Sequence, residues 1–548
     1  MANDKDYCKL LVRYPKAIAH LRWQVEKKRF GLVVGAGISK NFNVPMWETL
    51  VTDIASSPSV DGAKLIEGES AKNSLPYKTE MLFQRFQEKH SATNTGLSSL
   101  AEKNTVMAAW HRLCQEYIYR KPAPNLNSAL RTHPYFESLI LLVQDSYLTI
   151  NFNFDDFLER SLALRKQAKD VGTRGFEVVT DPWPQFRRTD SVIYHPHGYV
   201  PSGIMEKTVD RFVFSEGSYS SQYVGARGHD TSFLVAHFAR NTCLLVGCSL
   251  EDELRNVLMR GAEINPGNYH YYIHFVSDTA SPPNEIERRL IEDTNFKVYN
   301  LITIFLKTKE IDTLLRVINQ KCLPDPALND LSLQCKAPAK FTYYMTGPLG
   351  VGKSTTTNLL RSLHVLDEWQ EARLQVLSKP WDSLTKREEV KADNWIAQQF
   401  KKKNDALRHL KGSAISVVDR PPLDPLVFTK REDRPAKAKA LIDAICPERR
   451  YDVERGVVLL LLGNPDVLSA RVCATGRERY TPEKLKIMQD DMLEIYKDTP
   501  GVVVIDTTYL SVAELTKRVA QVIHREEYAP ADLMGILKSH EEKADAAA

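Results

Sequence analysis

The sequence predicts an α/β protein with two domains, each built around a parallel β-sheet. Apolar runs of strand length alternate with helical stretches, and this alternation stops once before it restarts in the second half. Runs that are apolar throughout suit strands whose two faces are both covered by helices. The chain of 548 residues is also too long for one ordinary domain, which takes roughly 150 residues.

Apolar runs predict the strands in order along the chain. Those of the first half are residues 29–35, 146–152, 242–249 and 271–276, and those of the second half are residues 341–347, 413–419, 457–463 and 501–506. Segment 321–340 separates the two sets, contains three prolines and keeps neither strand nor helix periodicity. We therefore expect a first domain over 1–320, a linker over 321–340, a second domain over 341–530 and a flexible tail over 531–548.

The composition is that of a soluble, cytoplasmic protein. Hydrophobic residues make up 43% and charged residues 26%, close to the globular average. The net charge of +4 favours no nucleic-acid partner, and the run Lys401–Lys403 is expected to be a solvated helix face. The first ten residues lack the pattern of a secretory signal, and the apolar run Val457–Leu462 is far shorter than the roughly 20 residues that span a membrane. The eight cysteines form no C-x-x-C pair, so we expect no disulfide framework.

A glycine-rich turn follows the first predicted strand, with Gly35, Ala36, Gly37 and Ser39 in the segment GAGIS. Two glycines at a strand end allow backbone N–H groups to approach a pyrophosphate without a Cβ in the way. The complete motif G-x-G-x-x-G is absent, so an ordinary strand-to-helix turn remains an alternative.

Asn153 and Asp155 follow the next buried strand, in the segment TINFNFDDFLE. This position corresponds to the carboxyl edge of a sheet, where α/β proteins bind their ligands. The alternative is that Asp155 or Asp156 only caps the helix that follows.

Two later strands also end in polar residues. His195 and His197 precede a glycine, and each histidine could equally be a packed core residue. Gly247 and Ser249 end the strand at 242–249, and an acidic helix start that includes Asp252 follows.

In this order the motifs G-A-G-I-S, P-x-W, N-F-D-D-F-L-E, H-G and G-C-S-L-E-D resemble the sirtuin-like family of NAD-consuming enzymes, and most closely its bacterial NAD-hydrolase branch that serves in antiphage defence. The resemblance spans roughly residues 25 to 275 and implies a Rossmann-like domain that binds NAD as its substrate. It implies that Gly35, Ala36, Gly37 and Ser39 surround the phosphates and that Pro45 and Trp47 shape the nicotinamide side. It further implies the catalytic pair Asn153 and His197, with Asp155, Gly247, Ser249 and Asp252 as other NAD-binding residues.

Two details qualify the match. The usual Tyr after the asparagine is Phe154, and His195 precedes a proline and is out of register with the H-G pattern, which favours His197. Zinc-dependent sirtuins also carry two C-x-x-C pairs for a tetrahedral site. Here the nearest cysteines, Cys243 and Cys248, lie five residues apart. We therefore expect no zinc, and hydrolysis of NAD+ in place of acyl-lysine removal.

The chemistry of this pair can be argued from the residues alone. Cleavage of the nicotinamide–ribose bond passes through an oxocarbenium-like state, as glycoside hydrolysis does. An asparagine amide can hold a water molecule against the anomeric carbon, and a histidine can polarise a ribose hydroxyl or accept a proton.

In the second half, GPLGVGKST fits the phosphate-loop motif G-x-x-x-x-G-K-[ST] in full, with a strand before it and a helix after it. Backbone N–H groups of such a loop surround phosphates, the lysine reaches the outer phosphates and the hydroxyl binds Mg2+. The residues concerned are Gly347, Gly350, Gly352, Lys353, Ser354 and Thr355. We expect ATP or another nucleotide here, with Ser354 and Asp419 as Mg2+ ligands.

Asp419 and Arg420 end the next strand, and Arg471, Arg477 and Arg479 precede a long helix. A carboxylate and mobile arginines suit transfer between phosphates, although Arg477 and Arg479 could simply be a solvated helix start. Over residues 341 to 525 these features resemble the thymidylate kinase and deoxynucleoside kinase family, which implies a P-loop kinase-like domain with the arginines in its lid. Pro421 and Pro422 depart from the family pattern and leave kinase activity open.

We therefore expect a nicotinamide-releasing NAD+ hydrolase, an effector of antiphage-type defence that is gated by the C-terminal nucleotide-binding domain and assembles as a homo-oligomer. The alternative is a nucleoside or nucleoside-monophosphate kinase whose N-terminal domain only binds NAD or ADP-ribose as a regulator.

Overall fold

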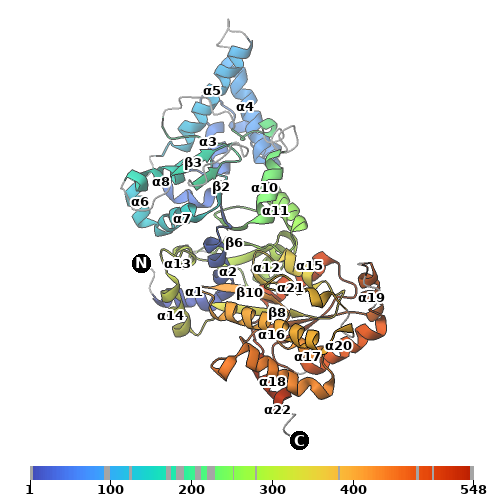
Figure 1. Ribbon diagram of the computed structural model, residues 1–548. Coiled ribbons are helices and arrows are strands. Elements are labelled where there is room, and N and C mark those ends of the chain that lie inside the picture. The colour runs from blue at the N-terminus through green and yellow to red at the C-terminus, as the bar shows by residue number, and fades with distance from the viewer. Residues whose placement is uncertain are drawn as a thin grey trace. The chain divides into compact units, whose positions relative to one another are not determined.

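The computed structural model describes residues 4–91, 99–121, 126–167, 175–180, 191–203, 212–218, 229–250, 252–277, 281–379, 383–474, 476, 480–496 and 499–542. They form two compact units. Unit 1 comprises Met1–Tyr7, Gln24–Ile264 and Tyr269–Cys322, and unit 2 comprises Cys8–Trp23, Asn265–Asn268 and Leu323–Ala548. Each unit contains its own parallel sheet (Figure 1). This confirms the predicted fold class.

The sheet of unit 1 has seven strands, in the order β3 (Phe176–Val179), β4 (Ser191–Tyr194), β2 (Leu148–Asn151), β1 (Phe30–Val34), β5 (Thr242–Val246), β6 (His270–Phe275) and β7 (Leu301–Leu306). Strand β1 is central, and its last residue Val34 is in register with Asn151 of β2 and Val246 of β5. The segments that follow these three strands therefore emerge together at one edge of the sheet.

The helices of unit 1 are α3 (Trp47–Ala55), α4 (Leu75–Ser91), α5 (Ser99–Ile118), α6 (Leu126–Thr132), α7 (Pro134–Asp145), α8 (Phe157–Gln167), α10 (His229–Arg240), α11 (Asp252–Ile264), α12 (Glu285–Tyr299) and α13 (Thr308–Ile318). Helices α3, α4 and α5 pack together around an apolar core of their own, and α4 and α5 run side by side (Figure 1). Trp47 and Phe154 pack against this core. The helical group therefore borders the segment after β2, where Asn153 lies.

The sheet of unit 2 has five strands, in the order β12 (Val502–Asp506), β11 (Val457–Leu462), β8 (Lys340–Thr346), β10 (Ala414–Asp419) and β9 (His364–Leu366). Every strand pair is parallel, and Met345 of the central strand β8 is in register with Asp419 of β10. The loop after β8 and the side chain that ends β10 therefore share one edge of the sheet.

The helices of unit 2 after the first sheet strand are α15 (Lys353–Leu359), α16 (Lys386–Arg408), α17 (Asp424–Val427), α18 (Arg434–Ile445), α19 (Pro465–Cys473), α20 (Pro482–Tyr496), α21 (Val512–Arg525) and α22 (Leu533–Glu542). Capping boxes begin two of them. In α21, for example, Ser511 accepts from the backbone N–H of Glu514, whose carboxylate accepts from the N–H of Ser511. No helix in the described part of the chain is long and apolar enough to cross a membrane.

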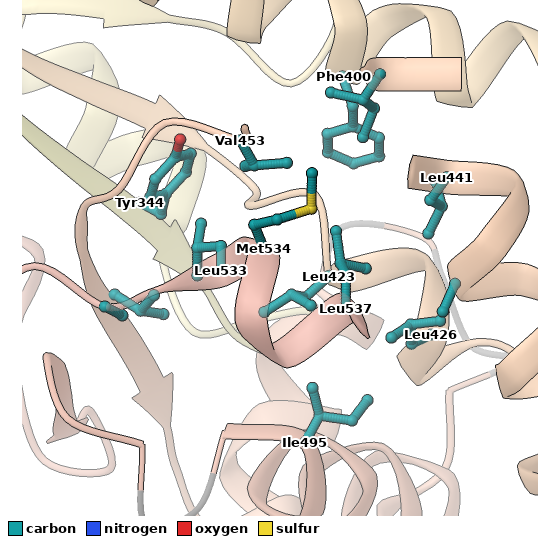
Figure 2. Packing of buried hydrophobic residues seen from close by; sticks show 14 of the residues in the cluster. Tyr344, Phe400, Leu423, Leu426, Leu441, Val453, Ile495, Leu533, Met534 and Leu537 are labelled. Atoms are coloured by element: carbon teal, nitrogen blue, oxygen red, sulfur yellow. The ribbon is translucent and has the colours of Figure 1, made fainter. Parts of the chain in front are cut away.

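The expected linker and tail differ from the structure. Segment 321–340 contains helix α14 (Asp325–Cys335), because proline in the first turn of a helix starts it without breaking it. The expected tail contains α22, whose Leu533, Met534 and Leu537 are buried in the core of unit 2 (Figure 2). Only these three apolar side chains of the short helix α22 are buried in this core. Such a sparse apolar pattern does not predict a packed helix from the sequence.

The boundary of the first domain also differs, because residues 8–23 belong to unit 2. They lie in α1 (Asp4–Arg13) and α2 (Pro15–Glu26). The guanidinium group of Arg22 is fully buried and donates to Asp325 at 2.6 Å, and Lys16 donates to the carbonyl of Glu526 at 2.5 Å. A disulfide joins Cys8 to Cys335. Residues 8–23 are thus part of the unit that the second half of the chain forms.

Candidate functional site

A cavity of about 130 Å3 lies in unit 1, at the carboxyl ends of β1, β2 and β5. The predicted residues that line it are Gly35, Ala36, Pro45, Trp47, Asn153, Asp155, His197 and Ser249. Cys248 and Glu253, which were not predicted as site residues, also line it. The side chain of Asp252 lies outside the described residues. Motifs separated by more than 200 residues therefore meet around one hollow.

The glycines of this edge are required mainly by contacts with one another. A Cβ on Gly35 would lie 2.6 Å from the carbonyl oxygen of Gly247, and a Cβ on Gly37 would lie 2.9 Å from the Cα of Gly247. The N–H of Gly37 donates to that same carbonyl, and the N–H of Gly35 donates to Val246. Most backbone N–H groups of this turn therefore already have an acceptor within the protein. Among the described residues, the N–H of Ala36 is the one in this turn without a partner, so it is the donor that could face a phosphate.

Asn153 is buried, with its side chain held by the first loop. Its Nδ2 donates to the carbonyl of Gly35 at 3.2 Å and to Oγ of Ser39 at 3.3 Å. Its Oδ1 is buried without a hydrogen-bond partner in the described part of the protein. A buried acceptor that lacks a partner costs free energy unless a ligand or water satisfies it. The amide of Asn153 is thus fixed in orientation, and its oxygen is left to accept a hydrogen bond from a ligand or a water molecule.

Asp155 lies beside Asn153 and is also buried. Burial raises the pKa of Asp155 to about 6, although hydrogen bonds from Ser39 and from the N–H of Phe157 act in the opposite direction. The bond to Phe157, at 3.1 Å, is the helix-starting contact that the alternative interpretation foresaw. Asp155 therefore starts helix α8 and also presents a carboxyl group that titrates near neutral pH.

The two histidines of the H-P-H segment have different surroundings. His195 is fully buried, away from the cavity lining, with Nδ1 3.0 Å from the carbonyl of Asn153 and Nε2 2.8 Å from Glu159. His197 lines the cavity, with Nε2 3.1 Å from Oε2 of Glu253. Both contacts pair a histidine with a glutamate, but only the second pair faces the hollow.

Aromatic rings make up much of the remaining wall. Trp47 lies 6.4 Å from the ring of His197 and stacks on Phe214 at 6.1 Å between ring centroids. Its Nε1–H is buried with no acceptor among the described residues. A donor on Trp47 and an acceptor on Asn153 thus lie in one mostly apolar cavity. Such a cavity suits a planar, partly polar group.

In unit 2 the phosphate loop has the backbone that its glycines permit. Gly347, Gly350 and Gly352 have φ values of 148°, 84° and 94°, in the region that side chains disfavour. Lys353 begins α15 and is buried, and its Nζ donates to the carbonyls of Gly347 and Pro348 at 2.7 and 2.9 Å. A bound phosphate would compete with these carbonyls for the ammonium group.

Three cations and three carboxylates are gathered behind this loop: Lys353, Lys403, Arg420, Glu368, Asp419 and Asp424. Arg420 has a positive φ of 69° and donates to Glu368 at 2.8 Å and to Asp424 at 3.0 Å. Burial, and then the charge of Arg420, lowers the pKa of Lys353 to about 8. The formal charges of these six side chains cancel, so the group as a whole is neutral before a phosphate binds.

Asp419 and Ser354 were predicted to hold Mg2+. Oδ1 of Asp419 is buried without a partner among the described residues, and burial raises the pKa of this carboxyl group although Arg420 and Lys353 lower it. Ser354 and Thr355 are exposed in the first turn of α15. One carboxylate and one hydroxyl are a donor set that fits Mg2+, which takes its other ligands from phosphates and water. Within the described residues, no cluster of three or more His, Cys, Asp or Glu side chains could hold a metal by itself.

Of the three predicted lid arginines, only Arg471 lies among the described residues. Arg471 in α19 donates through one nitrogen to the backbone carbonyls of Thr507 and Thr508, at 3.1 and 3.2 Å, and so braces the segment after β12. Arg477 and Arg479 lie outside the described residues. The described contacts of Arg471 are therefore with the segment after β12.

Sequence reasoning missed Glu253 and Lys403. Glu253 lies in the first turn of α11, directly after the acidic residues that were noticed. Lys403 was assigned to a solvated face, yet it is buried, and its Nζ donates to the carbonyl of Asp419 at 2.5 Å. Helical spacing could have found it, since Phe400, Lys403 and Leu407 fall on one buried face of α16. Lys402, one residue earlier, is exposed as predicted.

The folds and sites define an α/β protein with a Rossmann-like unit and a P-loop unit. Family models make this specific. A model described as a SIR2-like domain matches residues 147–299, and one described as an AAA domain matches residues 342–513. The chain therefore carries a SIR2-like domain followed by a P-loop domain of AAA type.

Comparison with curated proteins returns no match. Solved structures that match include the NadR protein in complex with NAD and AMP-PNP, at 12% identity and a TM-score of 0.26, covering 69% of this chain and 88% of that chain. The NadR protein in complex with NR matches at 13% identity and a TM-score of 0.25, covering 47% of this chain and 88% of that chain. Similarity at this level does not extend to function.

Proposed function

We propose that the protein hydrolyses NAD+ in the cavity of unit 1 and releases nicotinamide. The observation that carries this proposal is the buried Oδ1 of Asn153, which has no partner among the described residues and belongs to a wall shared with His197. The SIR2-like match over residues 147–299 includes both residues and supports an NAD-dependent reaction.

The reaction adds water to the ribose carbon C1′. The water oxygen bonds to C1′ while the C1′–nitrogen bond breaks, and the electron pair of that bond leaves with nicotinamide. The oxygen of Asn153 would accept a hydrogen bond from the attacking water and so orient its lone pair toward C1′. His197 would take the proton that the water loses, and this proton then passes to solvent. Trp47 and Pro45 would contact the nicotinamide ring, with the indole N–H of Trp47 available to its carboxamide.

Nicotinamide release by the purified chain tests this assignment. Asn153→Ala and His197→Ala should each reduce the rate by about 10²- to 10⁴-fold, the usual contribution of a positioned acid, base or polar group. Both side chains lie in a cavity wall, so circular dichroism and the unfolding temperature should show folded variants. Asn265→Ala is the control, since Asn265 belongs to unit 2. Two folded variants with wild-type rates would refute the assignment.

We further propose that unit 2 binds a nucleotide with Mg2+ and that this binding gates the hydrolase. Asp419 and Ser354 would hold Mg2+, which would offset the negative charge of the bound phosphates. The supporting observation is the path of the chain. Residues 8–23 are packed into unit 2, α2 continues to Glu26, and β1 begins at Phe30 and ends at the Gly35 turn. A change in unit 2 therefore has a short covalent route to the cavity.

Calorimetric titration with a nucleotide tests the gating. Lys353→Ala should weaken nucleotide binding by roughly 10- to 150-fold, since a hydrogen bond to a charged group is worth about 1.5–3 kcal/mol. Lys386→Ala, at a lysine whose side chain is 93% exposed, should leave it unchanged. Reciprocity requires that a non-hydrolysable NAD+ analogue change nucleotide affinity by the factor with which nucleotide changes NAD+ affinity. Two results together would refute gating: the analogue does not change nucleotide affinity, and Lys353→Ala hydrolyses NAD+ at the wild-type rate at every nucleotide concentration.

The same proposal gives the protein its cellular role. An NAD+ hydrolase that is gated by a second ligand suits an effector of antiphage-type defence, the role that the family resemblance implies. Assembly as a homo-oligomer belongs to this proposal. Light scattering at rising protein concentration measures the assembly directly, and a monomer at every concentration would refute it.

A further inference from the structure

The contact between His197 and Glu253 joins the segment after β4 to the first turn of α11, which is distant in sequence. His197 follows β4 and Glu253 follows β5, strands that are not neighbours in the sheet, and both side chains line the cavity. Nε2 of His197 lies 3.1 Å from Oε2 of Glu253, and their side chains are only 9% and 7% exposed. A buried contact of this kind constrains the orientation of the imidazole ring and determines which ring nitrogen carries the proton.

We infer that Glu253 is a positioning residue for the proposed hydrolysis, acting through His197. Its carboxylate orients the imidazole ring, holds the ring proton on Nε2 and stabilises the imidazolium that forms when His197 accepts a proton. The inference rests on the proposed function and extends it to a residue that no motif of the resemblance contains.

The tautomer follows from the partner. An ionised carboxylate can only accept, so a neutral His197 that contacts it carries its proton on Nε2. The lone pair then belongs to Nδ1, which is the atom that can take a proton from the attacking water. An asparagine or glutamine in place of Glu253 would not impose this choice, because an amide can either donate or accept.

The charge argument follows from the surroundings. Among the described residues, the titratable side chains that line the cavity with His197 are Glu253 from α11, Asp155 from the segment after β2 and Cys248 from the segment after β5. Aromatic rings also pack on the imidazole, among them Phe152 at 5.3 Å and Phe154 at 6.2 Å between centroids. A cation in an apolar pocket is costly unless it is paired, and Glu253 makes the direct contact.

The proton balance is simple. The water that attacks C1′ loses one proton to Nδ1 of His197, which becomes a cation paired with Glu253, while the nitrogen of the breaking bond keeps the electron pair. His197 returns the proton to solvent as the products leave. Glu253 keeps its charge throughout and gains no bond to the substrate.

The test measures kcat and KM for nicotinamide release by the full chain, with and without each common nucleotide. Glu253→Gln should lower kcat by about 10- to 100-fold, the order expected for a lost charged hydrogen bond, with KM little changed. Glu263→Gln, an exposed glutamate on the same helix, should match wild type in kcat and KM.

Asn153→Ala separates the two claims. Wild-type kcat in Glu253→Gln, beside an inactive Asn153→Ala, would overturn the role of Glu253 and leave the hydrolase standing. Full release by Asn153→Ala, or none by wild type under any nucleotide condition, would overturn the hydrolase and this role with it. Nitrogen-15 shifts of the His197 ring provide a check in the wild-type protein that needs no folded variant: a neutral ring protonated on Nε2 supports the inference, and one protonated on Nδ1 overturns it.

Discussion

Nδ1 of His195 lies 3.0 Å from the backbone carbonyl oxygen of Asn153. Because a carbonyl oxygen can only accept, Nδ1 must carry a proton, and the opposite ring nitrogen meets Glu159 at 2.8 Å. The histidine that the sequence pattern set aside thus holds the main chain of Asn153, whose side chain faces the cavity. The segment H-P-H therefore divides its work between support by His195 and the proposed chemistry of His197.

This division predicts different costs at the two histidines. His195→Leu should lower the free energy of unfolding by about 3 kcal/mol, because it leaves the buried carboxyl group of Glu159 without its partner. The double variant His195→Leu/Glu159→Leu should recover most of that loss. Urea unfolding measures both, and a single variant within about 0.5 kcal/mol of wild type would show that the pair does not support the fold.

Asp155 predicts a pH-dependent stability difference. Its pKa is raised from 3.8 to about 6 in the folded protein, mainly by burial. Between these values the folded state binds the proton and the unfolded state does not, so stability falls as pH rises. The full cost, about 3 kcal/mol at 1.36 kcal/mol per pKa unit, applies above pH 6 and is absent below pH 4.

Asp155→Asn should remove this cost and keep the acceptor for the N–H of Phe157. The variant should therefore gain stability relative to wild type as pH rises from 4 to 7, and the two should agree at the acidic end. Chemical unfolding across this range measures the difference. A constant difference at all pH values would mean that Asp155 ionises normally in the folded state.

The adjacent residues Lys402 and Lys403 should differ in their effect on nucleotide binding. Lys403 is buried on the carbonyl of Asp419, and burial lowers its pKa to about 8, whereas Lys402 is exposed. Lys403→Met leaves the buried charge group with an excess negative charge, so nucleotide binding should weaken by about 10-fold, the order of one charge-assisted contact. Lys402→Met is the matched control and should bind as wild type does. Equal affinities for the two variants would show that Lys403 has no part in the phosphate site.

Helix α22 predicts a core role for a segment that reads as a tail. Leu537 is fully buried, and Figure 2 shows it with Leu533 and Met534 among the apolar side chains of unit 2. Leu537→Ala should lower the free energy of unfolding by about 2–5 kcal/mol. Leu333→Ala, at a leucine that is 79% exposed, should change it by less than about 0.5 kcal/mol. Similar values for the two would place α22 outside the core.

Much of the fold could be predicted because buried parallel strands have a simple signature. The apolar runs at 29–35 and 457–463 became β1 and β11, each flanked by strands on both sides. The edge strands β3 and β9 escaped prediction for physical reasons. Strand β9 (His364–Leu366) has only three residues, and β3 (Phe176–Val179) is half-buried, so neither needs a continuous apolar run.

The sequence predicted those site residues that directly follow a strand of the parallel sheet. Parallel register brings the residues after β1 and β2 to one edge, so Gly35 and Asn153 could be expected to lie close together. The pairing of His197 with Glu253 depends on how the segment after β4 approaches the start of α11 in space, and no local pattern specifies it. The contact of Gly37 with Gly247 is of the same kind, since each glycine is explained by a residue over 200 positions away.

The most direct measurement of the central claim is the product balance when purified protein is incubated with NAD+, with and without each common nucleotide. We expect nicotinamide and ADP-ribose in equal amounts under at least one nucleotide condition, no need for an acyl-lysine peptide, and loss of both products in Asn153→Ala. NAD+ that remains intact under every condition, or nicotinamide that appears only when an acyl-lysine peptide is present, would contradict the account.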